Sequence, residues 1–287
     1  MLAEFAPAKI NLTLRVTGRR SDGYHLLDSL VGFADVGDTI RAAASDRVSL
    51  TVSGPFGASL SSEPDNLVLR AARALQDAHG VQAGAALRLD KHLPVASGIG
   101  GGSADAAAAL RVLSRLWRVD IPEGLAIKLG ADVPACLACR PCRMRGIGEV
   151  LEDVPGLPAC GLVLINAGVP VATKSVFAAR PPAFAAEDHY PDAWADADAL
   201  AAWAAASAND LEATARQICP EVGQALAALR DTQGAKLARM SGSGATCFAL
   251  FATPAEARRA ATNLARPGWW CWGGGLLPGL YAGRNAT

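Results

Sequence analysis

The sequence predicts a two-domain α+β protein, and three observations support this fold class. The chain has 287 residues, enough for two medium-sized domains that each bury a hydrophobic core. Its first fifty residues alternate apolar and polar positions as strands do, whereas residues 183–230 are rich in alanine and helical in character. A stretch bounded by prolines, at 155–158, lies between these regions. We therefore predict an N-terminal domain over residues 1–155 and a C-terminal domain over residues 156–287.

Two strands are expected near the N-terminus, at Lys9–Val16 and Arg47–Val52, because every second residue is apolar. Between them, Gly18–His25 is a polar loop bounded by glycines. It carries more polar and aromatic side chains than a simple reversal of the chain needs. Such loops often contribute to binding sites.

A helix is expected over residues 66–78, capped by Asp65 or Asn66, and a short strand over residues 86–90. The glycine run Gly98–Gly102 then opens an alanine-rich helix that reaches about Trp117. The order of strand, glycine loop and helix N-terminus is typical of phosphate-binding segments.

The glycine run is the strongest local indication of function. Four of its five residues are glycine, so consecutive N–H groups can point at an anion while the helix adds partial positive charge. A glycine-rich surface turn is the alternative, but Ser103 and the uninterrupted helix behind it favour a phosphate site. Two better-known phosphate loops do not fit, since the chain has no Gly-Lys-Ser/Thr and has Ser103 where a dinucleotide fingerprint needs Gly or Ala.

The C-terminal half predicts a strand at 163–165 and a helix capped by Asn209–Asp210. A hairpin-like stretch at 240–251 follows, and its residues Gly242–Gly244 form either a flexible loop that closes over a site or a plain turn. A closing helix and a strand rich in tryptophan, Trp269–Trp272, come last. These aromatic side chains are expected to pack at a sheet edge.

Composition favours a small-molecule partner. The formal net charge is zero and charged residues make up 19%, which argues against nucleic acid as a partner. The N-terminus has no apolar stretch of signal-peptide length, and apolar stretches elsewhere are interrupted by charges, Gly or Pro. We expect a soluble cytoplasmic protein without a membrane partner, either a monomer or a weak homodimer.

The seven cysteines fit a reducing compartment better than a disulfide framework. Cys136, Cys139 and Cys142 have spacing similar to the start of an iron–sulfur motif, but Gly146 stands where a fourth cysteine would be needed. A metal-free structural role is favoured, and a metal site is the alternative. We expect strand structure between Asp132 and Gly146.

The chain resembles the GHMP kinase superfamily at three separated places, which are residues 6–12, 94–105 and 241–245. Their order and spacing agree with the superfamily's motifs. Further matches lie at Pro64–Leu67, Leu129–Pro134, Gly146–Glu149 and Asn209–Glu212. The resemblance implies a two-domain kinase with its active site in the cleft between the domains.

The resemblance also implies that ATP binds at the glycine run, with Mg²⁺ bridging its phosphates. The residues expected to contact the nucleotide are Pro94, Gly98, Gly100, Gly101, Gly102, Ser103 and Ala104. Asp132 is implied as the general base toward the substrate hydroxyl, and Lys9 as its neighbour that keeps the carboxylate ionised and stabilises the transferred phosphoryl group. On local grounds alone, Asp132 would cap a helix and Lys9 would be a solvated charge on an edge strand.

Residues 17–30 are similar to the branch of the superfamily that acts on a cytidine-diphosphate substrate in the non-mevalonate route to isoprenoid precursors. This implies CDP-methylerythritol as the substrate and its 2-hydroxyl as the phosphate acceptor. The residues expected to contact the substrate are Asn11, Tyr24, His25, Thr173 and Phe177. Tyr24 and Phe177 would lie against the cytosine ring, and His25 would hydrogen-bond to its edge. Packing under the loop is the alternative for Tyr24 and His25, and a core position is the alternative for Phe177.

Two other functions remain open at this point. Another GHMP kinase, of the homoserine or mevalonate type, would keep the glycine run but lack a cytosine site. A non-catalytic nucleotide-binding or metal-binding protein centred on the three spaced cysteines is the second alternative.

Overall fold

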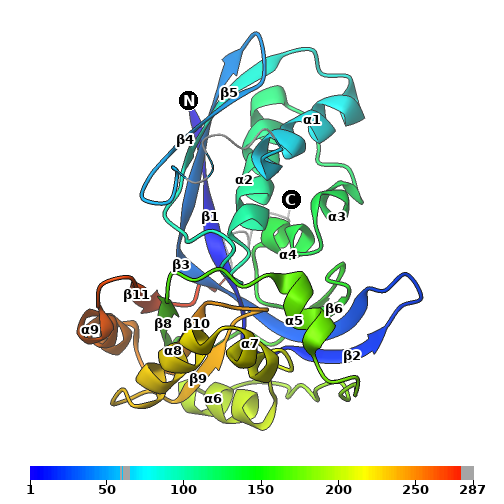
Figure 1. The fold of residues 1–287 in the computed structure, drawn as a ribbon. Helices are drawn as coiled ribbons and strands as arrows, with labels where there is room; N and C mark the ends of the chain where they lie inside the picture. The colour runs from blue at the N-terminus through cyan, green and yellow to red at the C-terminus, as the bar shows by residue number, and fades with distance from the viewer. Residues whose placement is uncertain (59, 61–64, 279–287) are drawn as a thin grey trace. The chain divides into compact units, whose positions relative to one another are not determined.

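Figure 1 shows the computed structural model of the chain, which describes residues 1–58, 60 and 65–278. Pro64, part of one sequence match, lies outside the described residues. The chain divides into two compact units. Unit 1 comprises residues 1–8, 36–95 and 100–139, and unit 2 comprises residues 9–35, 96–99 and 140 onward.

These units do not coincide with the predicted division after residue 155. Strands β1 (Leu2–Asn11) and β3 (His25–Ser45) each contribute residues to both units, and the chain passes from unit 2 to unit 1 between Ile99 and Gly100. Because the units reflect compactness alone, the domain boundary at 155 stays a prediction.

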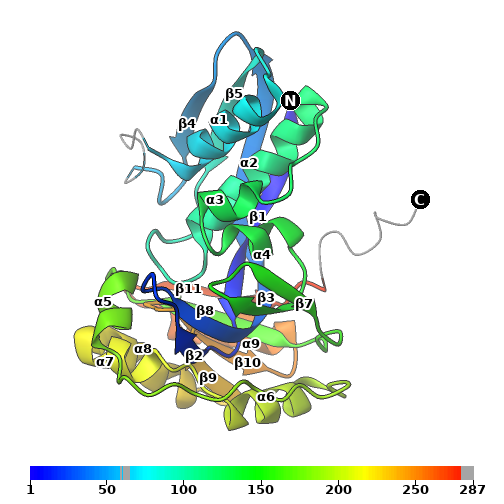
Figure 2. The same cartoon turned by 90° about the vertical axis from the view of Figure 1, so that its right-hand side faces the viewer.

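Unit 1 is built on the second half of β3. This half pairs antiparallel with β5 (Gly84–Asp90), and β4 (Ser49–Ser53) pairs parallel with β5. Figures 1 and 2 both show the helices of this unit on one face of its strands. They are α1 (Leu67–His79), α2 (Gly101–Trp117), α3 (Leu125–Leu129) and α4 (Val133–Ala138).

The boundaries of α1 and α2 follow from local chemistry. The Asn66 side chain accepts a hydrogen bond from the Val68 amide at 2.9 Å, and Gly80 ends α1 with a positive φ of 64°. Half of the buried residues of α2 are alanines, whose small side chains let α1 pack closely beside it. This packing fixes the start of α2, where the glycine run enters the helix.

Unit 2 contains a four-stranded sheet with the strand order β11-β8-β10-β9. Its strands are β8 (Gly161–Asn166), β9 (Leu237–Met240), β10 (Cys247–Phe251) and β11 (Trp270–Gly275). Neighbouring strands of this sheet pair antiparallel, and every residue of β8 and β10 is buried. A strand buried on both faces has a continuous run of apolar residues in its sequence, as at Val163–Ile165.

The helices of unit 2 are α5 (Thr173–Ala179), α6 (Ala197–Ala206), α7 (Glu212–Ile218), α8 (Pro220–Arg230) and α9 (Pro254–Leu264). α9 packs on β8 and β11, whereas α8 packs on β9 and β10. Unit 2 also contains the first half of β3, which pairs antiparallel with β2 (Arg15–Arg19) and with β6 (Cys142–Gly146). β7 (Val150–Asp153) pairs with β6.

Most predicted elements are confirmed. The helix at 66–78 and the strands at 47–52, 86–90 and 163–165 are present within a few residues, and the glycine run opens a helix that ends at Trp117. The hairpin of β9 and β10, the closing helix α9 and the tryptophan-rich strand β11 are also present. β11 is an edge strand of its sheet, as the tryptophan prediction requires.

Three predictions need correction. The single strand expected over Lys9–Val16 is divided between β1 and β2, because the Leu12 amide bonds to Leu30 whereas the Leu14 amide bonds to Ala208. Residues 133–138 form α4 where a strand was expected, and only 142–146 are extended. The helical region at 183–230 begins only at Ala197 in the structure.

No helix within residues 1–58, 60 and 65–278 is long and apolar enough to cross a lipid bilayer.

Candidate active site

A chain of buried hydrogen bonds in unit 2 begins at Lys9. Its ammonium donates to Asn11 Oδ1 at 2.9 Å, and Asn11 Nδ2 donates to the Ser29 hydroxyl at 2.7 Å. Ser29 in turn donates to the carbonyl of Thr13 at 2.5 Å. Lys9 and Asn11 are only 3% and 1% exposed, so Lys9 is not the solvated charge of the alternative interpretation. Lys9 and Asn11, two residues apart in β1, lie on the same side of the strand, as strand alternation requires.

The same network reaches the glycine run and the third sequence motif. The Asn11 amide donates to the Ser241 hydroxyl at 3.1 Å, and this hydroxyl donates to the Gly98 carbonyl, also at 3.1 Å. Segments that are far apart in sequence therefore meet at a single serine. Ser241 is fully buried.

Gly98 lies in backbone contact with the loop between β9 and β10. A Cβ atom on Gly98 would lie 2.5 Å from the carbonyl oxygen of Gly244 and 2.7 Å from that of Ser241. The Thr246 amide also donates to the Ser97 carbonyl at 2.9 Å. Gly98 has a φ of 76°, a conformation that disfavours side chains. Only glycine fits at this position.

The loop at 241–246 is buried and pinned by hydrogen bonds. The Gly244 amide donates to the Ser241 carbonyl at 3.0 Å. Asn209 lies shortly before α7, and its Nδ2 donates to the carbonyls of Met240 and Gly242, both at 2.8 Å. The structure therefore favours the plain-turn interpretation of Gly242–Gly244 over a flexible lid.

Asn209 was predicted only as a helix cap. Its Oδ1 does accept the Leu211 amide at 3.0 Å, but Leu211 is the residue at the cap position of α7. The second role of Asn209, holding the glycine loop, could not be derived from local sequence. The match at 209–212 was the available signal.

In unit 1, the start of α2 has the features of an anion site. Gly100 is the N-cap, with a φ of 63° and no capping side chain. A Cβ on Gly102 would meet only Leu67, at 3.4 Å, and Gly102 is exposed. The first amides of a helix lack partners within the helix, and its dipole places partial positive charge there. The backbone present fits the triphosphate of a nucleotide.

Asp132 stands at the N-cap of α4, with Pro134 in the first turn, as the local pattern predicts. Its side chain makes no capping hydrogen bond to this helix. The half-buried carboxylate therefore does not cap this helix, and the catalytic role implied by the resemblance stays a prediction. Lys9 belongs to unit 2 and Asp132 to unit 1, and their pairing stays a prediction.

The expected substrate-binding residues of unit 2 are partly brought together. The rings of His25 and Phe177 stack with centroids 4.9 Å apart and an interplanar angle of 28°. The hydroxyl groups of Thr173 and Ser243 lie 2.8 Å apart, which connects α5 to the third motif. Tyr24 is 57% exposed and does not face Phe177 in a ring contact; His25 occupies that place.

The surroundings of His25 lower the pKa of its imidazole. Burial lowers the pKa of this imidazole below its usual 6.5, and the positive charges of Arg180 and Arg19 lower it further. Phe177 is also partly buried against the hydrophobic core of unit 2, so its core interpretation holds alongside its contact with His25.

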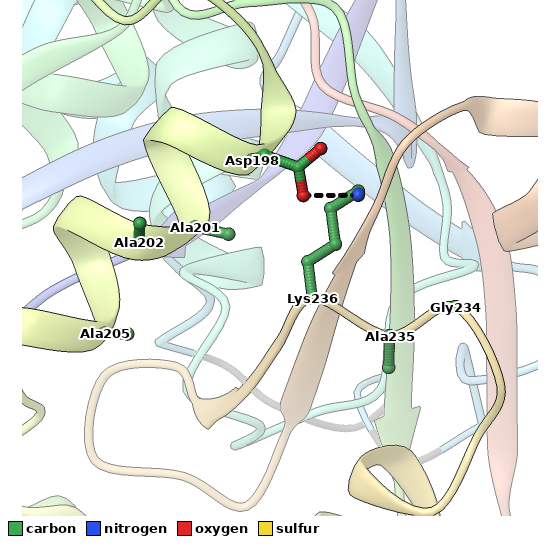
Figure 3. A pocket seen from close by; sticks show the side chains of 7 residues that line it. All are labelled: Asp198, Ala201, Ala202, Ala205, Gly234, Ala235 and Lys236. Carbon is green, nitrogen blue, oxygen red and sulfur yellow. Dashed lines mark hydrogen bonds and ion pairs between the residues drawn. The ribbon is translucent and has the colours of Figure 1, made fainter.

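Figure 3 shows a pocket elsewhere in unit 2 that contains none of the predicted site residues. It is lined mainly by alanines of α6 and by residues 234–236, and an ion pair of 2.5 Å joins Asp198 to Lys236 beside it. It offers little chemistry for a phosphorylated ligand.

The thiols of Cys136, Cys139 and Cys142 are buried, and burial raises the pKa of Cys142 to about 11. Among the residues that the structure describes, no group of three or more His, Cys, Asp or Glu side chains is placed to hold a metal ion.

Comparison with protein families adds independent evidence. The family model described as "GHMP kinases N terminal domain" matches residues 66–140, and "GHMP kinases C terminal" matches residues 192–268. The homoserine kinase of Cytophaga hutchinsonii is 18% identical and superposes with a TM-score of 0.71 over 95% of this chain and 94% of its own, which shows the shared fold. The fold and its motifs thus define a GHMP kinase.

Closer relatives identify the branch. The 4-diphosphocytidyl-2-C-methyl-D-erythritol kinase of Cereibacter sphaeroides is 56% identical, covering 94% of this chain and 97% of its own, and that of Granulibacter bethesdensis is 53% identical, covering 95% and 93%. A crystal structure of 4-(cytidine 5'-diphospho)-2C-methyl-D-erythritol kinase is 36% identical, with a TM-score of 0.78 over 96% of this chain and 99% of its own. The chain belongs to the family of 4-diphosphocytidyl-2-C-methyl-D-erythritol kinases.

Proposed function

We propose that this kinase transfers the γ-phosphoryl group of ATP to the 2-hydroxyl of 4-diphosphocytidyl-2-C-methyl-D-erythritol (CDP-methylerythritol). Relatives that are 52–56% identical over nearly the whole chain carry the name of this activity. The observation that carries the proposal is the buried network in which Asn11 and Gly98 are both hydrogen-bonded to Ser241. It joins the three motifs on which a GHMP kinase depends.

Asp132 is proposed as the general base. Its carboxylate would take the proton of the 2-hydroxyl while the oxygen forms a bond to the γ-phosphorus and the bond to ADP breaks. Lys9, fixed by its hydrogen bond to Asn11, would stabilise the negative charge that develops on the transferred group.

The amides at the start of α2 are proposed to hold the ATP phosphates. Mg²⁺, when bound with the nucleotide, would neutralise charge on those phosphates. Ser103 and the glycines before it would orient the chain for this contact, and Pro94 and Ala104 flank the same segment.

The cytidine end of the substrate is proposed to bind near Tyr24, His25, Thr173 and Phe177. A ring cannot enter between His25 and Phe177 while their centroids are 4.9 Å apart. A cytosine held between Tyr24 and Phe177 therefore requires His25 to move off Phe177. The neutral state of His25, favoured by its lowered pKa, lets one ring nitrogen accept a hydrogen bond from the base.

A coupled assay of ADP release tests the substrate. CDP-methylerythritol, homoserine and mevalonate are offered separately with Mg-ATP, and we expect turnover of the first alone. Turnover of homoserine or mevalonate without CDP-methylerythritol would move the chain to another branch of the superfamily. Asp132→Asn tests the base, with Asp153→Asn, whose side chain is 83% exposed, as the matched control.

We expect the enzyme to act in the cytoplasm, where ATP is available and its seven cysteines stay reduced. A monomer or weak homodimer is expected, and analytical ultracentrifugation at several protein concentrations distinguishes the two.

A further inference from the structure

A buried ionic cluster lies in unit 1, outside the residues assigned so far. Lys91 Nζ contacts Asp38 Oδ2 at 2.5 Å and Asp105 Oδ2 at 2.7 Å. The side chains of Lys91, Asp38 and Asp105 are exposed by 2%, 0% and 3%. Ion pairs buried to this degree are costly to assemble, so their position in the fold is informative.

The cluster connects both ends of the glycine-rich segment. Asp38 Oδ1 accepts the amides of His92 at 2.5 Å and of Leu93 at 2.8 Å, which fixes the turn after β5. At the other end, a Cβ on Gly101 would lie 3.1 Å from Lys91 Nζ, so the ammonium lies against the first residue of α2. Asp105 is one helical turn after Gly101 on the same helix.

The charges of the cluster matter because of this location. The Lys91 ammonium adds positive charge at a helix end that the dipole already makes positive, which favours a bound anion. Two ionised carboxylates would outweigh it and leave a net negative charge at the proposed phosphate site. Burial raises the pKa of Asp105 to about 7, with Lys91 opposing and Asp38 adding to the effect. Near neutral pH much of Asp105 is protonated, and the cluster is then close to neutral.

One further observation agrees with a protonated Asp105. Its Oδ1 is buried without a hydrogen-bond partner in the part of the chain that the structure describes. An orphan oxygen costs less on a neutral carboxyl than on a carboxylate.

We propose that Lys91, Asp38 and Asp105 are positioning residues for the triphosphate of ATP: they fix the turn before the glycine run and the first turn of α2, and Lys91 offsets negative charge that is buried there. This inference rests on the proposed function, since it takes the start of α2 as the phosphate site. A purely structural role for the cluster would stabilise the fold without setting nucleotide affinity.

The test measures ATP dissociation constants directly, by calorimetry without the second substrate, together with thermal unfolding. Lys91→Met should weaken ATP binding by about tenfold or more, because it removes the positive charge at the start of α2 and leaves the two carboxylates without their counter-charge. Adding Asp105→Asn to Lys91→Met should recover part of that loss, because it removes one of the two carboxylates. The control is Glu4→Gln, which weakens the ion pairs of the buried Glu4 side chain with Arg111 and Arg115 in the same unit. It should lower the melting temperature and leave ATP affinity unchanged.

Unchanged ATP affinity in Lys91→Met, or a further loss in the double variant, would overturn the proposal. If Lys91→Met does not fold, Asp105→Asn alone decides. It should bind ATP as the wild type does at about pH 6 and more tightly than the wild type at about pH 8.5, where Asp105 is ionised. If Asp105→Asn and the wild type bind ATP equally well at both pH values, the proposal is overturned as well.

The pH comparison depends on few other charges. Lys91 and Asp38 are the charged groups that act on Asp105, the buried face of α1 is apolar and α4 contains no charged residue. Lys128 of α3 is exposed. Failure of the kinase assay with CDP-methylerythritol would reject the proposed function but not this inference, because the binding experiment requires no turnover.

Discussion

Gly98 approaches Gly244 so closely that a methyl group on Gly98 would lie 2.5 Å from the Gly244 carbonyl oxygen. Gly98→Ala should therefore force the two loops apart, in addition to a backbone cost of about 1–2 kcal/mol for a left-handed conformation. We expect a lower melting temperature and a kcat/KM reduced by about two orders of magnitude, as expected when phosphate-binding groups are misplaced. Calorimetry and the coupled assay check both. Gly80→Ala is the control, since Gly80 also has a positive φ but has no atom within 4 Å of its Cβ position; equal losses of activity in the two variants would contradict the role of the contact.

Lys9→Met tests the proposed catalytic charge. Because Lys9 would act on charge that develops during transfer, kcat should fall by about 10²–10³-fold while the KM values change little. Lys128→Met, at an exposed position, provides the matched control. A Lys9→Met variant with undiminished kcat would remove Lys9 from the chemistry.

Tyr24→Ala should weaken binding of the cytidine substrate. A stacked base is worth about 1–3 kcal/mol, so KM for CDP-methylerythritol should rise by roughly five- to a hundredfold with KM for ATP unchanged. Phe184→Ala is a suitable control, since Phe184 is another exposed aromatic residue of unit 2, 50% exposed. The role of Tyr24 would be refuted if KM for ATP rose in parallel with KM for CDP-methylerythritol.

Asp105 should give the stability of the protein a dependence on pH. Its pKa is raised from 3.8 to about 7, so the folded state retains a proton that the unfolded state releases between these values. The stabilising contribution is complete below pH 3.8 and is lost as the pH rises to about 7, with a slope of at most about 1.4 kcal/mol per pH unit. Relative to Asp105→Asn, the wild type should become less stable across this window. Urea unfolding of both proteins at a series of pH values measures the difference, and a difference independent of pH would show that Asp105 titrates normally.

Arg143 and Arg145 should differ sharply in their contribution to stability. Arg143 donates from Nε and Nη2 to the fully buried Asp28, at 2.8 and 3.0 Å, whereas the Arg145 side chain is 34% exposed and pairs with surface glutamates. Arg143→Leu leaves a buried carboxylate without its counter-charge and should cost about 3–5 kcal/mol. Arg145→Leu should cost less than about 1 kcal/mol. Chemical denaturation of both variants measures the loss in the free energy of unfolding. Similar losses would show that the ion pair of Arg143 with Asp28 does not stabilise the fold more than the surface pairs of Arg145.

Much of the site could be predicted because its signals are local in sequence. The glycine run needs only its own residues and the helix behind it. The cap of α1 could be narrowed to Asp65 or Asn66 from their position before an apolar face, and the structure shows Asn66. The closeness of Lys9 and Asn11 follows from strand alternation alone.

The remaining features depend on pairings between distant segments. The long strand β3 was missed because residues 28–34 are buried without interruption, so no alternation marks them. Asp38 meets Lys91 because the register that places Thr39 opposite Asp90 continues by one residue, and nothing in the sequence near either residue specifies that register. The contact of His25 with Phe177 likewise joins a hairpin to a helix far along the chain.

The passage of β3 through both units has a practical consequence for protein engineering. Residues 25–35 of this strand complete one unit and residues 36–45 the other. No single cut in the polypeptide releases either unit whole, because three segments of unit 1 alternate with three segments of unit 2 along the chain. A fragment that stops near residue 155 would lack the entire sheet of β8 to β11. The two units must therefore be expressed together as one polypeptide.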